Sequence, residues 1–144
     1  MRMNHEPLLE TRQNQLGYVL SAGEAIDSKA LGVLGANIAV LIFIAQAGLW
    51  LDWWQWLLLL VPFAVSLVFD VLAIVPQNYR GNVSVSDHPE YLSMDEEDLL
   101  LQLIVDTEAA ITENNKLNFM RGSWYTISIV LSVFGAAILA LYLV

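Results

Sequence analysis

The sequence predicts an all-α membrane protein in which three transmembrane helices carry a cytoplasmic helical extension. Three apolar runs, at about residues 30–51, 55–76 and 123–144, predict the membrane spans. Each run is close to the ~20 residues that a helix needs to cross roughly 30 Å of hydrocarbon. The chain of 144 residues is 57% hydrophobic, compared with ~45–50% in ordinary soluble domains. Once these runs are subtracted, too few residues remain for a large soluble domain.

Residues 30–76 are expected to form a transmembrane hairpin. Asp27-Ser28-Lys29 stands immediately before the first run, where a helix would pass from water into lipid. Only residues 52–55 separate the two runs, so the two helices should be antiparallel. Pro62 lies inside the second run, where neighbouring helices make a kink tolerable, and Pro76 ends it. Four tryptophans crowd the turn, as expected for amphipathic rings at a headgroup interface: Trp50, Trp53, Trp54 and Trp56.

The cytoplasmic extension is expected to combine residues 1–29 with residues 77–122. From Leu16 onward apolar residues recur at helical spacing, which predicts a helix over about residues 6–29 that continues into the first span. Ser93 and Glu96 form a capping-box pattern, which predicts that a second, acidic helix starts at about residue 94.

This acidic amphipathic helix should continue into the third span, with Gly122 as its weak point. Its apolar stripe should pack against the N-terminal helix to form a small helical hairpin. The preceding segment, residues 77–89, has the composition of a loop, and a short strand at 83–85 would lack a partner.

The basic residues predict the orientation of the chain. Cytoplasmic segments of membrane proteins carry an excess of Lys and Arg. All six basic residues lie before the first span or between the second and third: Arg2, Arg12, Lys29, Arg80, Lys116 and Arg121. We therefore expect an inner-membrane protein whose N-terminus and residues 77–122 are cytoplasmic and whose C-terminus is outside.

Two polar residues inside the spans are candidate functional groups. Asp70 lies in the second run, and a carboxylate in a transmembrane helix is costly and often functional. It would serve as a pore, proton- or ion-binding group. We favour instead that it pairs with Lys29 or takes a shallow hydrated position, since both residues lie near the cytoplasmic interface. Asn37 in the first run is expected to be a hydrogen-bonding contact between helices.

Small residues line one face of two predicted spans. They are Gly32, Gly35, Ala36 and Ala39 in the first span, and Ser128, Ser132, Gly135 and Ala136 in the third. Such faces let helix backbones approach closely and drive association by packing. Packing within one chain would explain them, but three helices have more faces than partners. We therefore expect a homo-oligomer in the lipid bilayer.

Several classes of protein are disfavoured by composition. The chain has no cysteine and a net charge of −9, so thiolate chemistry is excluded and nucleic-acid binding is not expected. His5 and His88 lack metal-ligand spacing. The acidic cluster at 95–98 lacks the glycine and alternating ligands of a calcium loop. With no nucleophile–base pair, neither an enzyme nor a bound cofactor or metal is expected.

Several short motifs resemble the Pycsar-type prokaryotic transmembrane effectors of antiphage defence. The first is Ile26-Asp27-Ser28-Lys29-Ala30, which opens an apolar helix containing Leu34-Gly35. The second is Ala73-Ile74-Val75-Pro76 at the end of the second span. The resemblance resumes at Glu90-Tyr91-Leu92, continues through a helix to Lys116-Leu117 and ends in the final span. It covers most of residues 20–144.

The resemblance implies a non-enzymatic effector that senses a cyclic mononucleotide, oligomerises and impairs the integrity of the inner membrane. An anionic nucleotide needs cationic contacts, and four residues are candidates: Lys29, Arg80, Lys116 and Arg121. The presence of these four cations is also explained by the orientation of the chain in the membrane, without any nucleotide. The alternative function is a scaffolding membrane subunit that binds a protein partner through the acidic helix, and a transporter is a weaker third.

Overall fold

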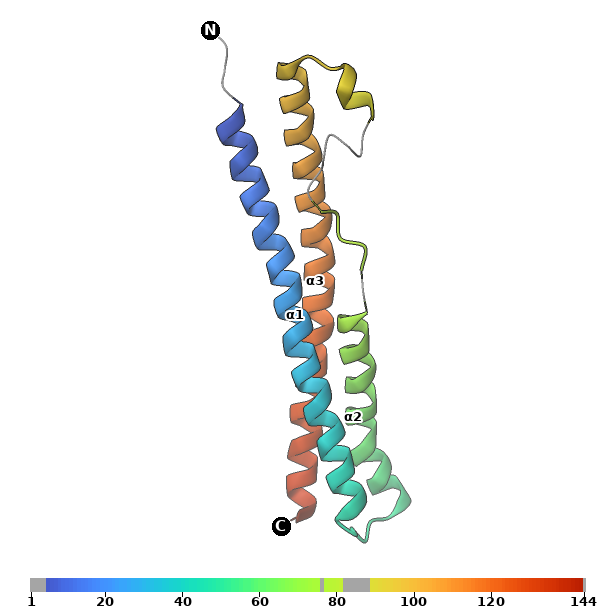
Figure 1. The fold of residues 1–144 in the computed structure, drawn as a ribbon. Coiled ribbons are helices and arrows are strands. Elements are labelled where there is room, and N and C mark those ends of the chain that lie inside the picture. Colours follow the sequence, from blue (N-terminus) through green and yellow to red (C-terminus); the bar gives the residue numbers. More distant parts are fainter. Residues whose placement is uncertain (1–4, 76, 82–88, 144) are drawn as a thin grey trace. The chain divides into compact units, whose positions relative to one another are not determined.

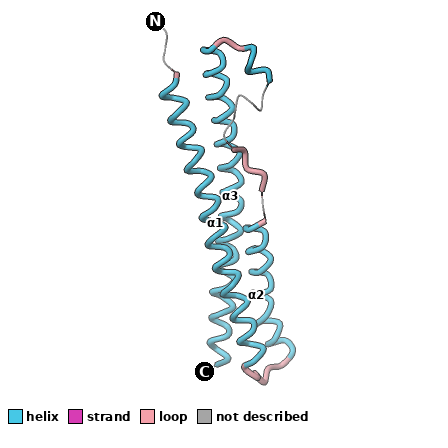
Figure 2. Tube along the Cα trace, viewed as in Figure 1, coloured by secondary structure: helices cyan, strands magenta, loops and turns pink. Residues whose placement is uncertain are grey.

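The computed structural model describes residues 5–75, 77–81 and 89–143, and these residues are almost entirely helical (Figures 1 and 2). The elements are α1 (Glu6–Gln46), α2 (Trp53–Ile74), the 3-10 turn η2 (Pro89–Ser93) and α3 (Glu96–Leu143). No strand occurs within the described ranges. The three α-helices are each long and apolar enough to cross a membrane, which confirms the predicted fold class. Pro76 and the strand expected at 83–85 lie outside the described residues.

The chain divides into two compact units, and α1 and α3 each contribute to both. The bundle unit contains residues 25–76 and 119–144, which include the three apolar runs. The acidic unit contains residues 1–24 and 77–118. It carries 12 acidic and 4 basic residues, whereas the bundle unit carries 3 and 2. Nearly all of the negative charge of the chain therefore belongs to one unit.

The core of the bundle unit joins all three helices. Ile44 of α1, Leu59 and Phe63 of α2 and Leu139 of α3 form one buried apolar cluster. The Phe63 ring packs on the backbone at Gly135, where an added Cβ would lie 2.8 Å from Phe63 Cε2. Gly135 is therefore required for the close approach of α2 and α3, as expected for a small-residue helix interface.

The turn between α1 and α2 explains where α1 ends and where α2 begins. α1 stops at Gln46, before the end of the apolar run at Leu51, and Gly48 adopts the left-handed conformation with φ 60°. Asp52 precedes α2, and its amide N–H donates to Gln55 Oε1 at 2.8 Å. Inside α2, the helix continues through Pro62. Local chemistry of the turn, rather than the length of the apolar run, ends the first span.

In the acidic unit, the start of α1 packs against the first half of α3, as predicted. Leu16 is fully buried, and Asn118 Nδ2 donates to the Val19 carbonyl at 2.7 Å. Arg12 and Glu108 form an ion pair at 3.7 Å between the two helices. The predicted helical hairpin is therefore present within this unit.

The predicted capping box at the start of the acidic helix is wrong. Ser93 lies in η2, where its hydroxyl donates to the Glu90 carbonyl at 2.9 Å, and α3 begins only at Glu96. At the start of α3, the Leu99 N–H donates to the Asp95 carbonyl at 2.8 Å. A local bond to its own 3-10 turn thus removes Ser93 from the capping position. Farther on, α3 continues through Gly122 without interruption.

Candidate functional site

Five polar side chains from the three helices meet inside the bundle unit. They are here called the polar cluster: Asn37, Ser66, Asp70, Ser128 and Ser132. Residues four apart on a helix project from the same face. α2 therefore presents Ser66 and Asp70 together, and α3 presents Ser128 and Ser132 together, while α1 supplies Asn37. The first four of the five are at least 98% buried.

Asp70 is the only ionisable member of the polar cluster and is completely buried. Its Oδ1 accepts a hydrogen bond from the Ser128 hydroxyl at 2.5 Å, and its Oδ2 accepts one from Asn37 Nδ2 at 3.0 Å. Asn37 is therefore a contact between helices, as predicted. The carboxyl group of α2 is thereby held by polar hydrogens from both α1 and α3.

The predicted pairing of Asp70 with Lys29 is wrong. Lys29 is exposed on α1, and no ion pair joins it to Asp70 among the described residues. Asp70 lies one helical turn before the last residue of α2, on the face that packs inward, so its short side chain meets Asn37 and Ser128 instead. The position of Asp70 near the end of the second span indicated how deep it lies in the membrane. It did not indicate the direction in which its side chain, or that of Lys29, projects.

A second polar contact ties the three helices together at Arg121. The guanidinium is 1% exposed, pairs through Nη2 with Asp27 of α1, and donates from Nε to the Ala73 carbonyl of α2 at 2.7 Å. The carbonyls of the last helical turn have no partner inside their helix, and a cation there also interacts favourably with the helix dipole. The sequence indicated Arg121 as an orientation-setting cation and as a candidate ligand contact, and it missed this structural role.

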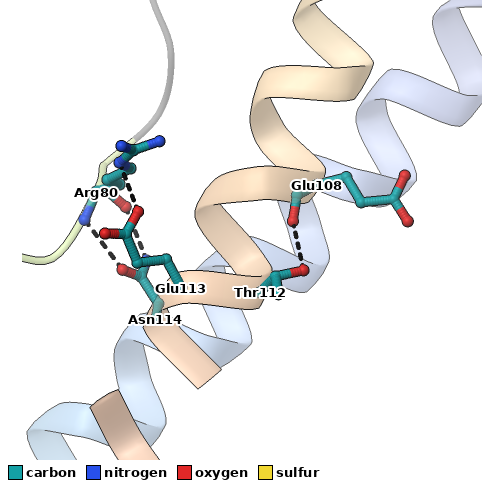
Figure 3. Close-up of polar contacts among 5 residues, drawn as sticks. All are labelled: Arg80, Glu108, Thr112, Glu113 and Asn114. Atoms are coloured by element: carbon teal, nitrogen blue, oxygen red, sulfur yellow. Dashed lines mark hydrogen bonds and ion pairs between the residues drawn. The ribbon is translucent and has the colours of Figure 1, made fainter. Parts of the chain in front are cut away.

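In the acidic unit, Asn114 holds the segment that follows α2. Its Oδ1 accepts from the Arg80 N–H at 3.0 Å and its Nδ2 donates to the Arg80 carbonyl at 2.8 Å, so one amide satisfies both backbone groups of Arg80 (Figure 3). Asn114 is fully buried. Glu113 pairs with Arg80 Nε at 2.7 Å on the surface, where both side chains are at least half exposed.

Tyr79 is anchored beside this contact. Its hydroxyl donates to Asn118 Oδ1 at 2.6 Å, and burial raises the pKa of the Tyr79 phenol above its ordinary value. A Cβ at Gly23 of α1 would lie 2.9 Å from the Tyr79 hydroxyl. Gly23 therefore makes room for the tyrosine, and the Asn118 amide joins Tyr79 to the Val19 carbonyl of α1.

The four predicted ligand-binding cations are in different environments. Lys29 and Lys116 are exposed, Arg80 is exposed and paired with Glu113, and Arg121 is buried and paired with Asp27. Arg80 and Lys116 belong to the acidic unit, whereas Lys29 and Arg121 belong to the bundle unit. An anion site made from all four residues stays a prediction. Arg121 would have to leave Asp27 and the Ala73 carbonyl, among its contacts, to take part in it.

In the part of the chain that the structure describes, no group of three or more His, Asp or Glu side chains is arranged to hold a metal ion. Comparison with known proteins adds no homologue: no family model matches the chain, and no curated protein or solved structure matches it significantly. The functional interpretation therefore depends on the chemistry of the residues and their contacts.

Proposed function

We propose that this chain is a non-enzymatic membrane effector that self-associates in the inner membrane, responds to a cyclic mononucleotide and impairs membrane integrity. The observation that carries the proposal is a face of α1 that the other described residues leave uncovered. The basic residues place the N-terminus and residues 77–122 in the cytoplasm under this proposal, where such a nucleotide would be sensed.

The uncovered face consists of Gly32, Gly35, Ala36 and Ala39, here called the α1 small face. All four residues are exposed, and a Cβ added at Gly32 or Gly35 would meet nothing within 4 Å. The comparable face of α3 is used within the chain, because Gly135 packs on Phe63. In a bilayer, small residues associate helices by letting backbones approach. A second copy of this chain is the partner that the α1 small face fits.

The nucleotide trigger rests on the sequence resemblance. Arg80 is the cation best suited to exchange partners, since its ion pair with Glu113 is exposed and such pairs are weak. A phosphate would replace the Glu113 carboxylate and accept hydrogen bonds from the guanidinium. Lys116, three residues after Glu113 on α3, is exposed and would add a second charge.

The test is dye leakage from vesicles that contain the purified protein, with and without a panel of cyclic mononucleotides. We expect leakage with one nucleotide, and we expect Gly35→Ile to abolish it together with self-association measured by cross-linking. Gly17→Ile is the matched control, because Gly17 is also on α1 with nothing within 4 Å but lies in the acidic unit. Leakage without any nucleotide would contradict the proposal that a nucleotide triggers the protein. No leakage with any nucleotide of the panel would contradict the effector function.

The charge of the acidic unit favours a second candidate function, a scaffold that binds a basic protein partner. Its 12 acidic residues against 4 basic ones produce a negative potential, which attracts cationic surfaces and opposes a nucleotide. Charge reversal of the exposed Glu96, Glu97 and Asp98 to lysine should then release the partner while self-association persists. An effector would keep nucleotide-dependent leakage in this variant.

A further inference from the structure

We propose that the polar cluster binds a monovalent metal cation of the sodium class between the three helices, with the Asp70 carboxylate as its charged ligand. This inference is independent of the nucleotide and of self-association. It starts from the charge of Asp70. The bundle unit has two basic residues, and neither neutralises this carboxylate: Lys29 is exposed, and Arg121 is paired with Asp27.

A buried carboxylate without a cation is unfavourable unless its lone pairs are fully used. The two Asp70 oxygens offer about four acceptor positions. The described residues fill two of them, with the Ser128 hydroxyl and the Asn37 amide. The carboxylate is therefore short of both positive charge and hydrogen-bond donors, and a small cation supplies the charge directly.

The surroundings of Asp70 are rich in the oxygen ligands that hard cations prefer. Ser66 Oγ lies 2.8 Å from both Ser128 Oγ and Ser132 Oγ, and 3.0 Å from the Ser128 backbone carbonyl oxygen. Ser132 Oγ also lies 2.9 Å from that carbonyl oxygen. Hydroxyl, carbonyl and carboxylate oxygens from α2 and α3 thus converge on one place.

Ser66 has more neighbours than a hydroxyl can satisfy. Its oxygen is within hydrogen-bond distance of four groups, including Asn37 Nδ2 at 2.8 Å, whereas a hydroxyl has one hydrogen and two lone pairs. The same crowding of oxygens becomes favourable when a cation sits among them, because each oxygen then directs a lone pair at the metal. The oxygens of this hydrogen-bonded network are therefore also the ligand shell of the proposed cation.

The charge of the site selects the class of cation. One carboxylate balances a monovalent ion, whereas a divalent ion would leave a net positive charge buried in the bundle. Only Asp70 among the three acidic residues of the bundle unit belongs to the polar cluster, because Asp27 is paired with Arg121 and Asp52 is exposed. Sodium, rather than calcium or magnesium, matches this count.

The test is binding of radioactive sodium to the purified protein in detergent, with choline chloride holding the ionic strength constant. We expect one saturable site per chain, and a thermal midpoint that rises with sodium but not with choline, as linkage requires for a ligand bound to the folded state. Asp70→Asn keeps the shape of the side chain, removes its charge and replaces one acceptor oxygen with an NH2 donor, and it should abolish both effects. Asp52→Asn is the matched control, since it removes one exposed carboxylate from the same unit and leaves a good helix N-cap.

Ser132→Ala is the second variant, because it removes one oxygen and keeps the carboxylate if Asp70→Asn does not fold. It should weaken sodium binding about tenfold or more. Sodium binding that Asp70→Asn leaves unchanged would overturn the proposal. A folded wild-type protein that binds no sodium would also overturn it.

Discussion

Asp27 of α1 and Arg121 of α3 form an ion pair in which one partner is buried and the other is not. The Arg121 side chain is 2% exposed, whereas the Asp27 side chain is 40% exposed. Arg121 also donates to the Ala73 carbonyl of α2. Arg121 thus links all three helices of the bundle unit. The different exposure of the two partners predicts different losses of stability when each one is removed.

Removing Asp27 should cost more stability than its exposure indicates. Asp27→Ala leaves a buried guanidinium without its counter-ion, and such single deletions cost about 3 kcal/mol. Arg121→Gln should cost less, because the remaining Asp27 carboxylate is partly in water. The measurement is unfolding of the variants in mixed micelles. The double variant should recover part of the loss, and strictly additive losses would show that the two residues do not interact.

Two glycines on neighbouring helices should respond oppositely to the same substitution. Gly135→Ala places a Cβ against the Phe63 ring and should destabilise the bundle by about 1–3 kcal/mol through overpacking. Gly35→Ala meets nothing within 4 Å and should be neutral or slightly stabilising within one chain. Thermal unfolding of the two variants side by side checks this. Equal losses would contradict the packing of Phe63 on Gly135.

Asn114 should be a strong determinant of order in the segment that follows α2. Asn114→Ala removes both hydrogen bonds to the Arg80 backbone and should cost about 1–3 kcal/mol. Hydrogen exchange at the Arg80 amide should accelerate. Glu113→Gln is the control, because it weakens an exposed ion pair worth about 0–1 kcal/mol and leaves the Asn114 contacts intact. Unchanged exchange in Asn114→Ala would contradict the contact.

Tyr91 should titrate at a higher pH than an ordinary tyrosine, whose pKa is 10.0. Its hydroxyl donates to Asp106, and this hydrogen bond, with burial and the Asp106 and Glu90 charges, raises the pKa of Tyr91 from 10.0 to about 12. Because the folded pKa is the higher one, the stabilisation is complete below pH 10 and is lost as pH rises through about 12.

Tyrosinate absorbance followed from pH 9 to pH 13 is the measurement for Tyr91. Tyr91→Phe should remove the component near pH 12 and should make unfolding of the acidic unit less dependent on pH above 10. Tyr18→Phe is the control, since Tyr18 is 78% exposed. A titration without a component near pH 12 would show that the contact of Tyr91 with Asp106 is absent in solution.

The spans and the helical extension were predictable because they depend on local composition and periodicity. Long apolar runs with few charges specify helices that cross a membrane, whatever their partners. The apolar spacing around Leu16 likewise predicted that the start of α1 packs against α3. The start of α3 was predicted wrongly because the Ser93 hydroxyl can either cap the helix or bond within the preceding turn. It donates to the Glu90 carbonyl, so it does not serve as the N-cap.

The sequence by itself determined that this is a three-helix membrane protein with its negative charge concentrated outside the apolar runs. Only the tertiary structure decided which polar groups meet. Asp70 lies with Asn37 and Ser128 rather than Lys29, and Arg121 lies with Asp27 rather than at an open surface. The reason is geometric: these contacts depend on which face each helix turns inward. That rotation is set by the packing of residues such as Phe63 on Gly135, far apart in the chain.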